Sequence, residues 1–132
     1  MATFYDIDRA NARLTELVPL LESLRNDREA VARTQLGLQR LRRSNGDGAH
    51  ARRAEELNEE LRSVIRQMEQ AVAQIESWSV TLRDIDSGLV DFPALVSGRQ
   101  VWLCWRLGEP AVGWWHEVTG GFSSRKALSD LE

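Results

Sequence analysis

Two segments of the chain place apolar side chains at alternating spacings of three and four residues, which is the repeat of an amphipathic helix. The first segment spans residues 8–43, although Arg28 and Gln35 occupy two positions of its apolar stripe. The second spans residues 49–78 and has a cleaner stripe. A glycine-rich run at 44–48 separates them, and a short loop between two long helices predicts an antiparallel helical hairpin.

Both expected helices also carry apolar residues outside this stripe. These residues predict a second contact face, and they are Leu20, Leu36, Leu41 and Ile65. A hairpin about 50 Å long cannot dehydrate both of its faces alone. We therefore expect a homodimer in which two hairpins form a four-helix arrangement. Pro19 removes one backbone hydrogen bond, and we expect the first helix to continue past it.

After Trp78 the apolar period becomes alternating, which indicates strands. The expected strands lie at 79–85, 89–95, 101–107 and 112–118. Turn sequences rich in glycine separate them, at 86–88, 97–98 and 108–111. The sequence therefore predicts an α+β chain. Its expected parts are a helical hairpin over residues 1–78, a small antiparallel meander over 79–122 that packs on the hairpin, and a tail over 123–132.

The lengths of the turns set which strand residues lie opposite one another. A two-residue turn at 97–98 places Asp91 opposite Cys104 and Phe92 opposite Leu103. One face of the sheet is then apolar and suits packing against the helices. The residues expected on this core face are Val90, Phe92, Ala94, Val101, Leu103, Trp105, Leu107, Val112, Trp114, His116 and Val118.

The last hairpin depends on the turn at 108–111, which we take as four residues long. That length places His116 opposite Leu103 and Trp115 opposite Cys104. The second face of the sheet then combines aromatic, thiol and charged side chains, a mixture typical of contact surfaces. The residues expected on it are Asp91, Trp102, Cys104, Arg106, Trp115 and Glu117.

Composition excludes several classes of protein. The 132 residues are 42% hydrophobic and 28% charged, as in ordinary globular chains, and no apolar run is long enough to span a bilayer. The first residues show neither the basic nor the apolar part of a secretory leader. The single cysteine, Cys104, cannot form an internal disulfide, so we expect a cytoplasmic location. The net charge of −3 argues against general nucleic-acid binding.

Four of the five tryptophans lie between Trp102 and Trp115. Tryptophan and arginine are common at binding hot spots, so the second face is our expected contact surface for a partner or a small ligand. We interpret the chain as a binding protein and not as an enzyme. The sequence does not indicate a particular cofactor.

The same region contains ligand types for a metal or haem, which gives an alternative function. The candidate ligands are His116, Cys104, Glu109, Glu117 and Asp91. Their spacing matches no established metal motif, and the expected register puts His116 and Cys104 on opposite faces. We therefore interpret His116 as a core histidine that bonds a backbone carbonyl or a carboxylate. Asp91 beside Cys104 would raise the thiol pKa, so we interpret Cys104 as structural and not nucleophilic.

A basic end of the hairpin gives a second alternative. Between Val31 and Ala54 the only acid is Asp47, and the candidate contacts for an anion or RNA are Arg33, Arg40, Arg42, Arg43, Arg52 and Arg53. Such a tip could touch RNA, a ribosome or an acidic protein. The simpler interpretation is a solvated helix end whose arginines complement the helix dipole.

Three runs of the chain resemble a known family. They are GLVDFPA at 88–94, VWLCWRLGE at 101–109 and GWWHE at 113–117. Together with the Ala10–Asn11 start of the first helix, they resemble the prokaryotic domain of unknown function 2203 family over nearly the whole chain. The resemblance implies no activity, cofactor or catalytic residue.

Overall fold

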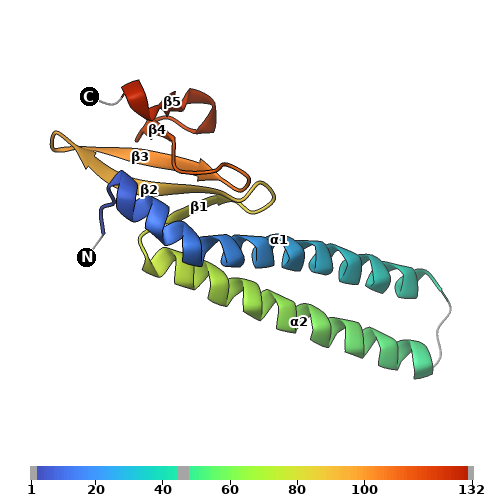
Figure 1. Cartoon of the computed structure of the whole chain (residues 1–132). Coiled ribbons are helices and arrows are strands. Elements are labelled where there is room, and N and C mark those ends of the chain that lie inside the picture. The colour runs from blue at the N-terminus through green and yellow to red at the C-terminus, as the bar shows by residue number, and fades with distance from the viewer. Residues whose placement is uncertain (1–2, 45–47, 131–132) are drawn as a thin grey trace.

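Two long helices and a small sheet make up the chain (Figure 1). The computed structural model describes residues 3–44 and 48–130. Helix α1 (Ile7–Arg43) and helix α2 (Gly48–Ser77) pack against each other as an antiparallel hairpin. The predicted α+β architecture is confirmed. Most of the predicted loop between the helices, residues 45–47, lies outside the described residues.

The N-terminal half of α1 lies at the centre of the hydrophobic core. The Asp6 side chain accepts a hydrogen bond from the Arg9 backbone N–H at 2.7 Å, which caps the first turn. Leu17, Leu21 and Leu24, spaced at four and three residues, are all fully buried. The helix continues through Pro19, as expected.

The sheet has five antiparallel strands in the order in which they occur along the chain. They are β1 (Thr81–Asp84), β2 (Leu89–Val96), β3 (Arg99–Arg106), β4 (Trp114–Glu117) and β5 (Lys126–Ala127). Two 3-10 turns, η1 (Phe122–Ser124) and η2 (Leu128–Asp130), flank the last strand. The sequence analysis missed β5, which lies in the expected tail.

The helices pack on the apolar face of the sheet, and Figure 1 shows β5 beyond β4, at the edge of the sheet away from the helices. Val90, Phe92, Leu103 and Trp105 point into the core with almost no exposure. Tyr5 secures the start of the chain, since its N–H bonds the Pro93 carbonyl and its hydroxyl bonds the Trp78 carbonyl. The sheet therefore rests on the hairpin through side chains from both helices.

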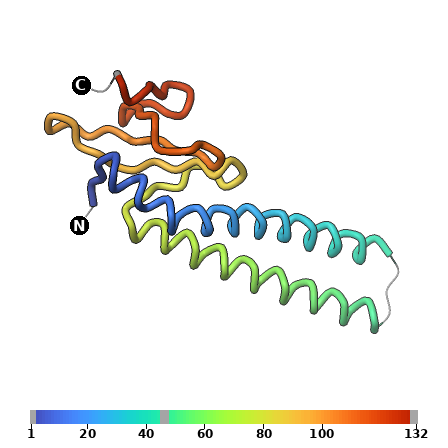
Figure 2. The backbone as a smooth tube through the Cα atoms, in the orientation of Figure 1, coloured from blue at the N-terminus to red at the C-terminus, as the bar shows by residue number. Residues whose placement is uncertain are grey.

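The hairpin is longer than the sheet that it supports. Figure 2 shows both ends of the described chain near the sheet, while the last turn of α1 and the first turn of α2 lie at the far end. We call the part of the hairpin beyond the sheet, residues 25–44 and 48–70, the arm. In the described part of the chain, no helix is both long and apolar enough to cross a membrane.

The register between β2 and β3 agrees with the prediction, but that between β3 and β4 does not. Asp91 lies opposite Cys104, as expected. Leu103, however, lies opposite Trp115, and Trp102 lies opposite His116. The predictions that placed His116 opposite Leu103 and Trp115 opposite Cys104 are wrong by one residue.

The loop between β3 and β4 explains this shift. Seven residues separate the strands, and an odd number changes the register by one relative to a four-residue turn. The Val112 N–H leaves the sheet because it donates to the Asn11 side chain at 2.8 Å. Trp115 consequently joins the core face, while Trp114 and His116 lie on the second face and Val118 is exposed.

Candidate metal centre

The corrected register brings three ligand types together on the second face of the sheet. Asp91 of β2, Cys104 of β3 and His116 of β4 each lie on a different strand. One ligand atom from each lies within 4.8 Å of the other two, and all three residues are buried. Alternation along neighbouring strands places these side chains on one face, whereas the expected register had separated His116 from the other two.

Both ring nitrogens of His116 have partners. Nδ1 lies 2.8 Å from the Glu117 backbone oxygen, and Nε2 lies 3.0 Å from Asp91 Oδ2. A carbonyl oxygen can only accept, so Nδ1 carries the proton in this bond. Because the Glu117 carbonyl fixes Nδ1 as a donor, Nε2 is the ring nitrogen that could bind a metal, once it gives up its hydrogen bond to Asp91. The expectation that His116 bonds a carbonyl or a carboxylate is confirmed.

Asp91 is held in place from a second side. The Arg83 Nε donates to Asp91 Oδ2 at 2.8 Å, and its guanidinium carbon lies 5.1 Å from the centre of the Trp102 ring. The other carboxylate oxygen, Oδ1, is buried and has no hydrogen-bond partner in the described part of the chain. A buried oxygen without a donor is costly, and a cation would satisfy it.

The Cys104 thiol keeps its proton at neutral pH. Burial raises the pKa of the thiol to about 12, and the negative charge of Asp91 acts in the same direction. Nucleophilic cysteines instead need a lowered pKa. The environment therefore argues against catalysis by a free thiolate, as expected, and a metal ion at this place would have to displace the proton.

A small cavity opens beside the three side chains. Its volume is about 240 Å³. Besides Asp91, Cys104 and His116, it is lined by Arg83, Leu89, Val118, Gly120, Gly121 and Phe122. The segment that follows β4 thus lines the cavity beside the three side chains.

The other two candidate ligands lie outside this cluster. Glu109 forms an ion pair with Arg125 and accepts a hydrogen bond from the Arg106 backbone N–H. The Glu117 carboxylate pairs with Arg99, so only its backbone carbonyl reaches His116. Both carboxylates serve structural contacts and not the centre.

The predicted contact surface is only partly exposed. Asp91, Cys104 and Trp115 are buried, and Trp115 faces the core. Trp102 is half-buried beneath Arg83, whereas Arg106 is exposed and lies over the Phe122 ring. Trp114 takes the place that was expected for Trp115, and the Arg125 guanidinium stacks on it.

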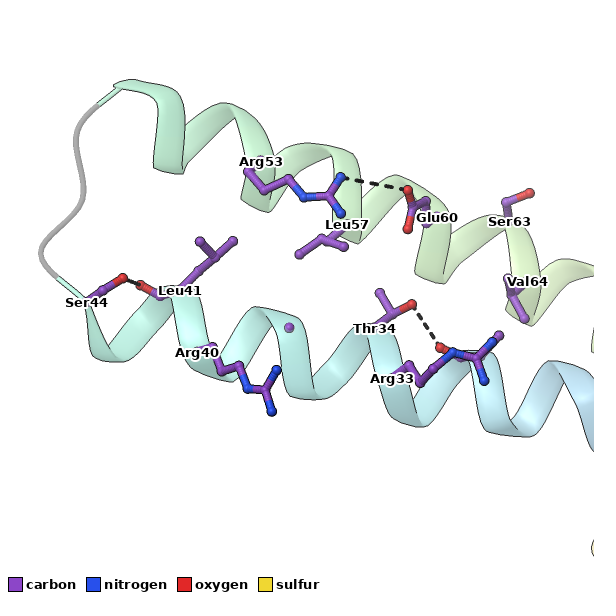
Figure 3. Close-up of a pocket in the computed structure, with 12 residues that line it drawn as sticks. Arg33, Thr34, Arg40, Leu41, Ser44, Arg53, Leu57, Glu60, Ser63 and Val64 are labelled. Atoms are coloured by element: carbon purple, nitrogen blue, oxygen red, sulfur yellow. Dashed lines mark hydrogen bonds and ion pairs between the residues drawn. The ribbon is translucent and has the colours of Figure 1, made fainter.

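The structure brings the predicted basic residues together at the distal end of the arm. Figure 3 shows Arg53 paired with Glu60 along α2, on one side of a groove between the helices, with Arg33 and Arg40 on the opposite helix. Within the described residues, five of the six predicted arginines form no ion pair, and they are Arg33, Arg40, Arg42, Arg43 and Arg52.

Arg83 is the one residue of the centre that the sequence analysis did not select. Its position one residue before the end of β1 made it look like an ordinary charged strand residue. The pairing of β1 with β2 would have indicated Arg83 as a neighbour of Asp91. Thr81 lies opposite Asp91, and Arg83 follows on the same face of β1. A bulge between Leu82 and Asp84 then lets Arg83 reach the carboxylate.

These features define a class of protein in which a helical hairpin supports a small sheet with a buried Asp–Cys–His cluster. The chain belongs to the family described as uncharacterized conserved protein (DUF2203), whose family model matches residues 3–128. The resemblance noted in the sequence is thereby confirmed over nearly the whole chain. Neither a curated protein nor a solved structure matches it significantly.

Proposed function

We propose that this protein binds a divalent transition metal ion of the zinc type through Asp91, Cys104 and His116. The observation that supports the proposal is their convergence, since three buried ligand atoms lie within 4.8 Å of one another. Thiolate, imidazole and carboxylate together are ligands that suit zinc, whereas magnesium and calcium prefer oxygen alone.

The protein needs only small movements to close around the ion. Bond lengths of about 2.0–2.3 Å place neighbouring zinc ligands roughly 3.5 Å apart. His116 Nε2 and Asp91 Oδ2 already lie 3.0 Å apart, and the widest separation among the three ligand atoms, at most 4.8 Å, would close by about 1 Å through side-chain rotation. The ion would replace the His116–Asp91 hydrogen bond and would provide a partner for the unpaired Asp91 oxygen.

Three protein ligands leave one position of a four-coordinate zinc ion for water or a small ligand. The cavity beside Arg83 and Phe122 gives that position access from outside. Structural zinc sites usually have four protein ligands, so this centre more closely fits the open type. The proposed function is metal binding, with exchange at one coordination position.

A tryptophan-rich contact surface is the less well supported alternative. Three of its six expected side chains are buried, so they cannot touch a partner without rearrangement. The exposed part that remains includes Arg106 and the neighbouring Trp114. A metal centre explains why polar ligand types are buried at the same place, and a contact surface does not.

Titration of the purified chain with Co²⁺ tests the proposal, because cobalt replaces zinc and a bound thiolate gives an absorption band. The chain has a single cysteine, so such a band reports Cys104. We expect one ion per chain. Removal of an outer-shell partner costs about 10–100-fold in metal affinity, so Cys104→Ser, Asp91→Asn and His116→Ala should each cost about 100-fold or more.

The other histidine provides a matched control. His50 lies at the distal end of the arm, and His50→Ala should bind Co²⁺ like the unchanged chain. Far-UV circular dichroism shows whether each variant keeps its helices. Absence of the band in the unchanged chain, or its persistence in folded His116→Ala, would contradict the proposed metal centre.

A further inference from the structure

The arm leaves its apolar seam incompletely covered. Among its described residues only Leu38 and Leu57 are buried, although the apolar repeat continues along both helices. Leu36 and Ile65 are 46% and 41% exposed. A pair of helices without a third layer cannot dehydrate such a repeat, so this surface is suited to a further helix.

One side of the hairpin, at the end of the arm nearest the sheet, is hollowed into an apolar groove of about 750 Å³. We call it the Ile65 groove, and its apolar lining is Val31, Ala32, Ile65, Met68, Val72 and Ala73. Glu69 and Glu76 of α2 lie along its rim. Neither carboxylate forms an ion pair within the described residues, so both are available to a basic partner.

The distal end of the same arm carries the opposite charge. Arg42 and Arg43, in the last turn of α1, and Arg40 just before them make no ion pair in the described ranges 3–44 and 48–130. Elsewhere on the hairpin, arginines such as Arg53 and Arg62 are paired with glutamates. Each chain therefore presents unpaired arginines at the tip and unpaired carboxylates closer to the sheet.

From this arrangement we infer that the occupant of the Ile65 groove is a second copy of this chain, packed in the opposite direction. Val31 and Ile65 both line the groove. Arg42 lies eleven residues beyond Val31, and Glu76 lies eleven residues beyond Ile65. At 1.5 Å per residue each is about 16 Å from the groove centre, in opposite directions along the arm.

A two-fold axis perpendicular to the arms, between the two chains at the level of Val31 and Ile65, consequently brings Arg42 of one chain to the same height along the arm as the partner's Glu76, and the same pairing occurs twice. A parallel pair would instead place two arginine tips together, which is repulsive. Apolar burial in the groove supplies the attraction, and the charges select the antiparallel direction.

Charge reversal tests this dimer directly. One variant carries Arg40→Glu, Arg42→Glu and Arg43→Glu, and the other carries Glu69→Arg and Glu76→Arg. Light scattering at micromolar concentration should give a dimer mass for the unchanged chain and a dissociation constant at least about tenfold weaker for each variant alone. An equimolar mixture of the two variants should regain the dimer, because both contacts are then attractive again.

The apolar part of the interface has its own matched pair of variants. Ile65→Glu should give monomers, whereas Leu95→Glu, at a similarly exposed residue of strand β2 outside the groove, should leave the dimer mass unchanged. A monomer mass for the unchanged chain would overturn the inference. Dimers that persist in both charge-reversal variants would also overturn it. So would a monomeric chain that binds RNA through its tip arginines.

Discussion

At the scale of single residues, Cys104 sets the conditions under which metal can bind. Burial and the charge of Asp91 raise the pKa of its thiol to about 12, so the thiol is protonated throughout the neutral range. Only the thiolate binds zinc well. Metal binding therefore has to release this proton, and the energetic cost of doing so falls as the pH rises.

This coupling predicts that the apparent affinity for zinc increases with pH. One released proton corresponds to about a tenfold gain per pH unit between pH 6 and pH 8, since the thiol pKa lies far above that range. Competition with a chromophoric chelator at several pH values measures the slope. An affinity independent of pH would mean that the Cys104 thiolate is not a ligand.

The sequence analysis named Asp91, Cys104 and His116 among five candidate ligands, but it did not predict that these three lie together. Asp91 and Cys104 were placed opposite each other because a two-residue turn leaves little freedom in pairing. His116 was assigned to the wrong face, since its position depends on how many residues of the next loop stay outside the sheet. The length of that loop depends on Asn11, 101 residues away in sequence, whose side chain accepts a hydrogen bond from the Val112 N–H.

At the scale of elements, a tight turn at Gly88 connects β1 to β2. Its φ of +65° is a conformation that residues with a Cβ rarely adopt. Its Gly N–H bonds the Ile85 carbonyl, and its own carbonyl accepts from the Leu107 N–H. The turn thereby fixes where β2 begins, and Gly88 lies three residues before Asp91.

We expect Gly88→Ala to destabilise the protein by about 2–4 kcal/mol, because strain and a steric clash add. A Cβ at this position would lie 2.5 Å from the Leu107 side chain. Gly98→Ala is the matched control, since its φ is +78° but no atom lies within 4 Å of the added carbon. It should cost only about 1 kcal/mol. Urea denaturation compares the two, and equal losses would contradict this account of the turn.

Helical elements were more predictable than strands. Their three-and-four repeats extend over thirty or more residues, and the observed ends of α1 and α2 differ from the expected ones by a single residue. Strand β5 has only two residues and no apolar alternation of its own. Its formation depends on pairing with Trp114 and Trp115, which a local pattern cannot reveal.

At the scale of the whole molecule, the arm and the proposed metal centre lie on separate surfaces. The helices cover one face of the sheet, whereas Asp91, Cys104 and His116 lie on the other (Figure 1). Variants at the tip of the arm should therefore alter association without altering metal binding. The two proposals can fail independently, since neither surface contributes residues to the other.

The most direct test of the metal centre is anomalous scattering at the zinc absorption edge from crystals grown with equimolar zinc. We expect one strong peak per chain between Asp91, Cys104 and His116, with a distance of about 2.3 Å to Sγ and about 2.0–2.1 Å to Nε2. A peak elsewhere on the surface, or no peak beside a His116 ring still bonded to Asp91, would contradict the proposed centre.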